Sequence, residues 1–142
     1  MIANIKDIKL AINKAIKTIS TSKIISSDIE EGFKRPCFKV IFGDVDTESI
    51  GIYMLKKDMI VRIYYYPEDR DKNDLELMNI QDSLALLFLD PLIVSENFII
   101  HPLEYVDRLV DNVLQASFEL NYIQELDKED SSLMIDTIEL EI

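Results

Sequence analysis

The chain has 142 residues, of which 48% are hydrophobic and 30% are charged, and its formal net charge is −12. This length favours a single domain over residues 1–142, and the apolar fraction excludes an intrinsically disordered chain. The one cysteine, Cys37, excludes an internal disulfide and fits a reducing compartment. No apolar run approaches the roughly 20 residues that cross a bilayer, and no signal-peptide pattern is present. We therefore expect a chain made in the cytoplasm, with no membrane partner.

The charge is unevenly distributed along the sequence. Residues 1–25 carry five lysines and one aspartate, a local charge of +4, so the remainder carries −16. Such an acidic surface repels phosphates, which argues against nucleic-acid binding and against anionic membranes. Oppositely charged patches could orient copies of the chain toward one another, although solubility alone accounts for the same charge.

The first half of the chain predicts one helix followed by four strands. Isoleucines and alanines recur every three or four residues from Ile5 to Ile19, so we expect a helix of about 17 residues that ends at Ser20–Ser22. The strands are expected at Lys23–Ile29 and Cys37–Phe42, then, after a loop at Gly43–Asp46, in a hairpin with arms Ile50–Leu55 and Met59–Tyr66 and a turn at Lys56–Asp58. In the last arm one face is apolar and the other is amphipathic.

A second helix is predicted over residues 74–89, capped by Asn73 or Asp71 and ended by Asp90 and Pro91. It has two apolar stripes. The first holds Leu77, Ile80, Leu84, Leu87 and Phe88, and the second holds Leu75, Met78, Leu86 and Leu89, interrupted by Asp82. A helix that is apolar on two sides is normally covered on two sides. Because so small a domain has little left to cover the second stripe, we expect Leu75, Met78, Leu86 and Leu89 to contact another subunit.

The last part of the chain predicts a strand pair and an acidic arm. The strands are expected at Phe98–Leu109 and Val113–Leu126, with a turn at Val110–Asn112. Pro102 marks an edge strand or a bulge. Residues 125–142 form an acidic arm that ends in the alternating sequence Ile138–Ile142, a short strand without an evident partner in its own chain.

Together these elements predict an α+β fold in the order α-β-β-β-α-β-β with a short C-terminal strand. We expect a mostly antiparallel sheet of four to five strands, covered by the two helices.

The residues that usually carry chemistry do not form a recognisable site. His101 is a lone histidine before a proline, and Cys37 lies at the start of a strand, where a small buried hydrophobe is the favoured role. The carboxylates of Asp44, Asp46 and Glu48 alternate as in a cation loop, but the glycine and the later glutamate of an EF-hand are missing. No phosphate loop or hydrolase motif is present, so we predict no catalytic residues, no cofactor, no metal and no enzymatic activity.

Three consecutive tyrosines, Tyr64–Tyr66, could in principle stack on single-stranded nucleic acid. Such platforms normally lie in a positively charged groove, whereas Glu68 and Asp69 follow here. Core packing on one face and subunit contact on the other is the more economical interpretation.

Short motifs give the sequence a family resemblance. The matching positions are Gly32, Phe33, Pro36, Cys37 and Phe38, then Tyr64, Tyr66 and Pro67, and finally Asp111, Val113 and Leu114. In this order they resemble the tail terminator, or tail completion, proteins of phages of Gram-positive hosts and of phage-tail-like bacteriocins. The chain departs from that pattern at Gln115 and Ala116, and it lacks a proline between the first helix and the first strand.

The resemblance implies a structural role in the virion tail, at its head-proximal end, or in a phage-tail-like particle. Copies would form a ring, expected to be hexameric, that caps the tail tube, stops its polymerisation and joins it to the neck, head or collar. The implied partners are the chain itself, the tube protein, the sheath protein of a contractile tail, and neck or connector proteins, without sequence-specific nucleic-acid binding.

Beyond the helix stripe, the interface candidates are Phe33, Arg35, Ile138, Leu140 and Ile142. Two alternatives remain: a head–tail stopper or connector, and a cytoplasmic α+β adaptor module.

Overall fold

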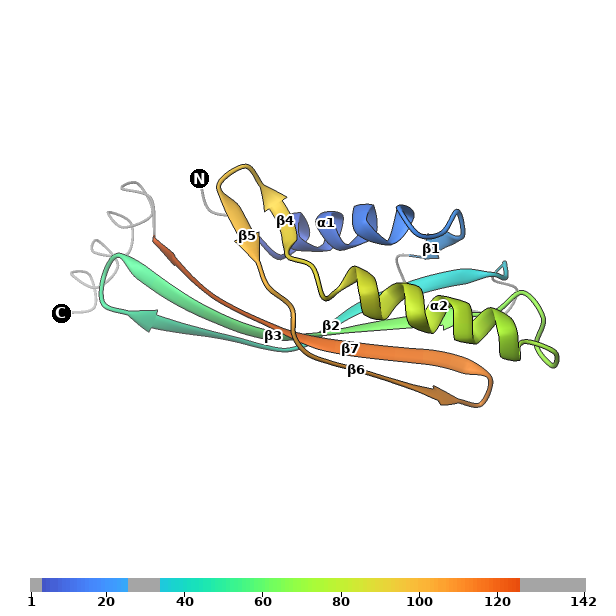
Figure 1. The fold of residues 1–142 in the computed structure, drawn as a ribbon. Helices are drawn as coiled ribbons and strands as arrows, with labels where there is room; N and C mark the ends of the chain where they lie inside the picture. Colours follow the sequence, from blue (N-terminus) through green and yellow to red (C-terminus); the bar gives the residue numbers. More distant parts are fainter. Residues whose placement is uncertain (1–3, 26–33, 126–142) are drawn as a thin grey trace.

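Two helices and seven strands make up the part of the chain that the structure, a computed structural model, describes: residues 4–25 and 34–125 (Figure 1). In chain order they are α1 (Ile5–Lys17), β1 (Lys23–Ile25), β2 (Cys37–Ile50), β3 (Met54–Tyr66), α2 (Asp74–Leu87), β4 (Leu92–Ser95), β5 (Phe98–Ile100), β6 (Leu103–Val110) and β7 (Val113–Glu125). The predicted strand at 138–142 and part of the one at 23–29 lie outside the described residues.

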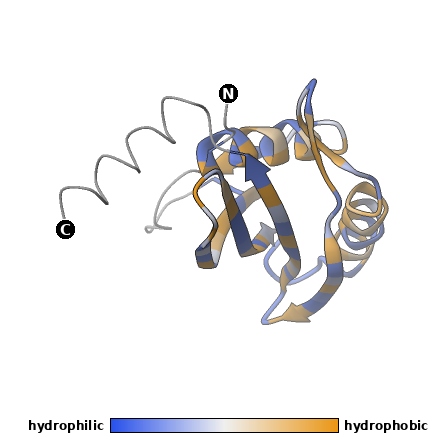
Figure 2. Cartoon of the chain, turned by 90° about the vertical axis from the view of Figure 1, so that its left-hand side faces the viewer, coloured by the Kyte–Doolittle hydropathy of each residue, from blue (hydrophilic) through white to orange (hydrophobic). Residues whose placement is uncertain are grey.

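Five strands form one sheet in the order β1-β2-β3-β7-β6, and β4 pairs with β5 in a separate hairpin. β1 runs parallel to β2, whereas the other neighbours in the large sheet are antiparallel. Hydrophilic and hydrophobic residues alternate along the strands, as Figure 2 shows. The predicted α+β class, with two helices and a mostly antiparallel sheet, is confirmed.

α1 is held at both ends by side-chain hydrogen bonds. At its start, the Asn4 side chain accepts from the backbone N–H of Asp7 at 2.9 Å, and the Asp7 carboxylate accepts from the N–H of Asn4 at 3.0 Å. At its end, the Thr18 hydroxyl donates to the carbonyl of Ala15 at 2.6 Å. The helix therefore has 13 residues and ends at Lys17, several residues before the predicted end at Ser20–Ser22.

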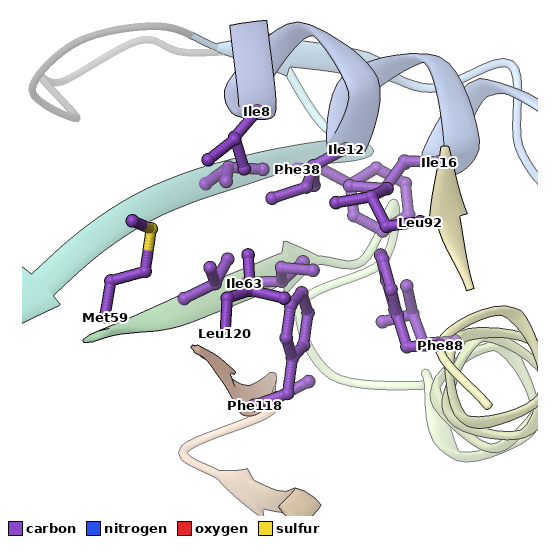
Figure 3. Packing of buried hydrophobic residues seen from close by; sticks show 14 of the residues in the cluster. Ile8, Ile12, Ile16, Phe38, Met59, Ile63, Phe88, Leu92, Phe118 and Leu120 are labelled. Carbon is purple, nitrogen blue, oxygen red and sulfur yellow. The ribbon is translucent and has the colours of Figure 1, made fainter. Parts of the chain in front are cut away.

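The core lies between the sheet and the two helices, which cover the same face (Figure 1). Ile8, Ile12 and Ile16 point from α1 toward the sheet, where Phe38 and Ile63 meet them (Figure 3). Leu77, Leu84 and Phe88 of α2 are buried, and the Phe88 ring stacks on Phe118 of β7 with centroids 4.6 Å apart. The apolar stripe of α1 and the first apolar stripe of α2 thus face the sheet, which the two helices were predicted to cover.

The hairpin between β2 and β3 extends further than the sequence suggested. The predicted loop at Gly43–Asp46 is wrong, because β2 continues through it with a register shift between Gly43 and Asp46. The predicted turn at Lys56–Asp58 is also wrong, since these residues pair with Asp46–Glu48 and the chain reverses at residues 51–53, where Gly51 has φ +72°. The side chains of this part of β2 face water, so apolar alternation does not mark it as a strand.

The second strand pair also differs from its prediction. The expected arm Phe98–Leu109 is divided at His101 and Pro102 into β5 and β6, because proline cannot donate to a ladder. β6 is an edge strand with a register shift between Leu103 and Val106, as Pro102 indicated. The β4–β5 hairpin was not predicted. The turn after β6 is confirmed, with φ of +52° at Asp111 and +62° at Asn112.

The start of α2 uses its asparagine in an unexpected way. Asn73 occupies the cap position, but its side chain makes no capping hydrogen bond. Instead the buried side chain donates to the carbonyls of Asp69 and Arg70, at 3.0 Å each, and so closes the preceding loop.

Candidate assembly surface

The second apolar stripe of α2 faces away from the sheet. Its members, which we call the α2 outer stripe, keep large exposed fractions: Leu75 78%, Met78 53%, Leu86 66% and Leu89 73%. Leu89 lies two residues beyond the end of the helix, which was predicted to include it. No element of the described residues covers these side chains, so the stripe is available for a contact between chains.

The other predicted interface residues lie elsewhere. Arg35 is anchored within its own chain: its guanidinium donates to the carbonyl of Pro67 at 3.3 Å and lies 5.8 Å from the centre of the Tyr66 ring. Arg35 is therefore held beside the end of β3 and is not part of the α2 outer stripe. Phe33, Ile138, Leu140 and Ile142 lie outside the described residues, so their role as interface residues remains a prediction.

The structure adds an apolar surface that the sequence analysis missed. The turn between β2 and β3 carries four exposed apolar side chains, which we call the hairpin tip: Ile50, Ile52, Tyr53 and Met54. It lies at the far end of the sheet from the β6–β7 turn (Figure 1). Gly51 among these residues was the available signal, because a glycine flanked by apolar residues also marks a hairpin turn.

The sheet face opposite the helices has no covering element among residues 4–25 and 34–125 (Figure 1). The ladder places on it a group of side chains that we call the open face. Its members are Lys39, Ile41, Ile60, Arg62, Tyr64, Val106, Arg108, Gln115, Ser117 and Glu119. These ten side chains include three cations and one carboxylate, with apolar side chains between them. Further along the same side of β3 lie Asp58 and its ion-pair partner Lys56, 4.0 Å away.

Arg62 reaches across the open face to β2. Its guanidinium lies against Gly43, where a Cβ atom would collide with it, and one of its nitrogens is 3.7 Å from a carboxylate oxygen of Asp44. Beside it, a hollow of about 420 Å³ is lined by Arg62, Tyr64, Val106 and Arg108 among others. The absence of a side chain at Gly43 leaves room for the guanidinium at this place.

The residues considered for catalysis or metal binding do not form a common site. Cys37 is fully buried, and burial raises the pKa of its thiol despite the opposing effect of Arg35. His101 is exposed in the connection between β5 and β6. Within the described residues, no three histidine, cysteine, aspartate or glutamate side chains are grouped so that they could hold a metal ion.

A comparison with protein-family models matches the chain over residues 7–132 to a family described as phage tail terminator protein. The chain belongs to the phage tail terminator family. It is thus a structural protein of a phage tail, and it interacts with other tail components. A comparison with curated proteins finds no match. The described part of this tail terminator has no helix long and apolar enough to cross a membrane.

The described residues of the family motif contribute to the fold of this tail terminator, through core packing, strand pairing and the conformation of a turn. Phe38 packs against Tyr65, with ring centroids 4.7 Å apart, and Cys37 pairs with Tyr66 across β2 and β3. Asp111 supplies a positive φ in the turn before β7, and Leu114 is buried in the core. Gly32 and Phe33 lie outside the described residues.

Proposed function

We propose that this tail terminator forms a closed ring of identical copies, six by the resemblance described above, at the head-proximal end of the tail. The ring would cap the tube, stop its polymerisation and join it to the neck, head or collar. The observation that carries the proposal is the exposure of the α2 outer stripe in a chain that belongs to this family.

A ring needs two different surfaces on each copy, because head-to-tail contacts join unlike patches. The described residues include two separate apolar surfaces that could serve in this way, the α2 outer stripe and the hairpin tip. Contact between the stripe of one copy and the tip of the next would hide both from water. Their separation in the fold supports a heterologous interface over a two-fold one.

The free energy of association decides whether free copies form the ring by themselves. Burying a fully exposed large apolar side chain contributes roughly 1.5–3 kcal/mol, and association costs about 4–15 kcal/mol in lost freedom. The four side chains of the stripe and the four of the hairpin tip, already partly covered, therefore together roughly balance the cost of one contact. We expect copies to associate weakly when free and to close into a ring on the end of the tube.

The partners follow from this position. They are the tube protein below the ring, the uppermost sheath ring if the tail is contractile, and neck or connector proteins above it. The particle that contains the ring is either an infectious phage or a phage-tail-like bacteriocin. We expect no sequence-specific contact with DNA, because the chain carries a net charge of −12.

Tail length tests the proposal. Particles made without the chain should have overlong tubes, and the normal chain should restore one uniform length in electron micrographs. The double variant Leu75→Ser/Met78→Ser should fold but leave the tubes overlong. Leu10→Ser, at an exposed position of α1, is the matched control and should restore the length.

Normal tail length with the double variant would contradict a role of the stripe in capping. Tails of normal length that lack heads, made when the chain is absent, would indicate a stopper or connector instead.

A further inference from the structure

Within the described residues, the open face brings together cations from three strands of the large sheet, with β7 lying between the second and the third of them. Lys39 is on β2, Arg62 on β3 and Arg108 on β6. Within the described residues, Lys39 and Arg108 form no ion pair, and Arg62 meets only Asp44, at the long distance of 3.7 Å. Such a surface fits a partner that is acidic and partly apolar.

The chain itself contains a segment of that chemistry. Residues 126–142, which follow β7, hold six carboxylates and one lysine, a formal charge of −5. Their last five residues alternate isoleucine or leucine with glutamate: Ile138, Glu139, Leu140, Glu141 and Ile142. An extended chain with this pattern presents apolar side chains on one side and carboxylates on the other.

We propose that residues 126–142 of one copy lie across the open face of a neighbouring copy and so link the subunits of the ring. The inference rests on the ring proposed above and names one of its contacts. The carboxylates of Glu139 and Glu141 are expected near Arg62 and Arg108. The apolar side chains of the segment are expected against Ile41, Ile60 and Val106.

The reach of the segment is sufficient. Seventeen extended residues span at most about 56–61 Å, about twice the roughly 26 Å that the eight-residue step along β7 from Glu125 to Ser117 covers, so the segment is long enough to pass beyond its own sheet. In a closed ring the next copy lies within such a distance, so the same length allows the segment to reach the open face of a neighbour.

A second hollow lies closer to the end of β7 but suits this segment less well. It has a volume of about 940 Å³ and lies between α1, the β4–β5 hairpin and the last residues of β7. Its lining includes the carboxylates of Asp7, Glu96 and Glu125 and a single cation, Lys14. Repulsion between like charges therefore disfavours the acidic segment there.

Nucleic acid suits the open face less well than the segment does. The cations are separated by apolar side chains, and the chain as a whole repels phosphates.

A ring also holds neighbouring segments at an effective concentration that can reach the millimolar range, so even a weak contact between segment and open face would be occupied.

Disulfide trapping between full-length chains tests the proposal. One chain carries Val106→Cys, at a side chain that is 61% exposed on the open face, and the other carries Leu140→Cys. Cys37 is fully buried and can stay. Mild oxidation of the mixed chains, purified alone and bound to tail tubes, should give a disulfide-linked dimer on non-reducing gels. The double variant Arg62→Glu/Arg108→Glu should reduce its yield at least tenfold.

Lys17→Cys in place of Val106→Cys is the matched control, since Lys17 is exposed on α1 in the other layer. Equal yields at the two positions would overturn the proposal. A chain carrying both Val106→Cys and Leu140→Cys should form a ladder of linked chains. A fast-migrating monomer with an internal disulfide would show instead that the segment covers its own sheet.

A labelled DNA duplex provides the remaining test. Binding that disappears in Arg62→Glu/Arg108→Glu, without any trapped dimer, would assign the open face to nucleic acid and overturn the proposal. Tail length remains an independent measure of capping. Uniform tails without trapping would reject this contact alone, whereas trapping by a chain whose loss leaves tail length unchanged would reject the capping role alone.

Discussion

The hydroxyl of Tyr65, on β3, donates a hydrogen bond of 2.5 Å to the carboxylate of Glu76, on α2. The same carboxylate oxygen accepts from the backbone N–H of Glu68 at 2.9 Å. One side chain in the first turn of α2 thus ties the helix to β3 and to the loop between them. A second tie joins α2 to β6, where Gln81 donates to Asp107 at 2.6 Å. These contacts fix the rotation of α2 and so hold its outer stripe away from the sheet.

Replacing Tyr65 with phenylalanine should lower the free energy of unfolding by about 1–3 kcal/mol, because a nearly buried hydrogen bond to a charged group is lost. Urea denaturation at pH 7.5 would measure the change. Tyr64→Phe, on the open face, is the control and should change stability by less than about 0.5 kcal/mol. Equal effects of the two substitutions would mean that the bond to Glu76 contributes nothing.

Stability should fall in alkaline solution. Burial, and secondarily the hydrogen bond to Glu76, raises the pKa of Tyr65 above its usual value near 10. Burial also raises the pKa of Tyr105 and Tyr122. Above about pH 10 the unfolded chain binds fewer protons than the folded chain, so the free energy of unfolding decreases as pH rises, while below that pH the contribution is complete.

The alkaline effect of Tyr65 can be separated from the others by denaturation between pH 8 and pH 11. In Tyr65→Phe the decline should be shallower by up to about 1.4 kcal/mol per pH unit. Parallel declines in the two proteins would show that Tyr65 ionises equally in the folded and unfolded states.

The sequence predicted the parts of the fold where burial imposes a period. The buried isoleucines of α1 recur with the helical period, and every second residue from Met59 to Tyr65 is buried, as in a strand. One regular pattern therefore identifies each of these elements. The outer part of the β2–β3 hairpin carries no such pattern, because its side chains lie in water and polar residues such as Asp46 and Glu48 are acceptable there. This is why the turn was placed several residues from Gly51.

Of the candidate surfaces, one could be predicted from the sequence and another could not. The excess of apolar residues on α2 is enough to identify the outer stripe from the sequence, since spacing alone separates two sides of a helix. The open face could not be predicted, because it depends on which strands are neighbours. β3 and β7 are separated by α2 and three further strands in sequence, yet their pairing brings Arg62 beside Ser117, and β6 then adds Arg108.

Two leucines of α2 provide a direct comparison of core and surface. Leu84→Ala should lower the free energy of unfolding by about 2–5 kcal/mol, because Leu84 is fully buried and its loss leaves a cavity. Leu86→Ala, two residues away and 66% exposed, should change it by no more than about 0.5 kcal/mol. Chemical denaturation of the isolated chain measures both. A large loss for Leu86→Ala would show that the outer stripe is already covered within its own chain.

Two glycines should respond in opposite directions to the same substitution. Gly51→Ala should destabilise the chain by about 1–2 kcal/mol, because φ at Gly51 is +72°, a strained value for alanine, although its surroundings are open. Gly43→Ala meets only the end of the flexible Arg62 side chain, which can move aside. That variant should be neutral or gain up to about 1 kcal/mol through the lower entropy of its unfolded state.

Thermal denaturation distinguishes the two variants, since 1 kcal/mol corresponds to roughly 3–4 °C for a chain of this size. Gly51→Ala should melt several degrees below the parent chain, and Gly43→Ala should melt at or slightly above it. A loss for Gly43→Ala as large as that for Gly51→Ala would show that Arg62 is held rigidly against β2. A movable Arg62 is also what a docking surface requires, because its guanidinium must leave Asp44, 3.7 Å away, in order to pair with a carboxylate from another chain.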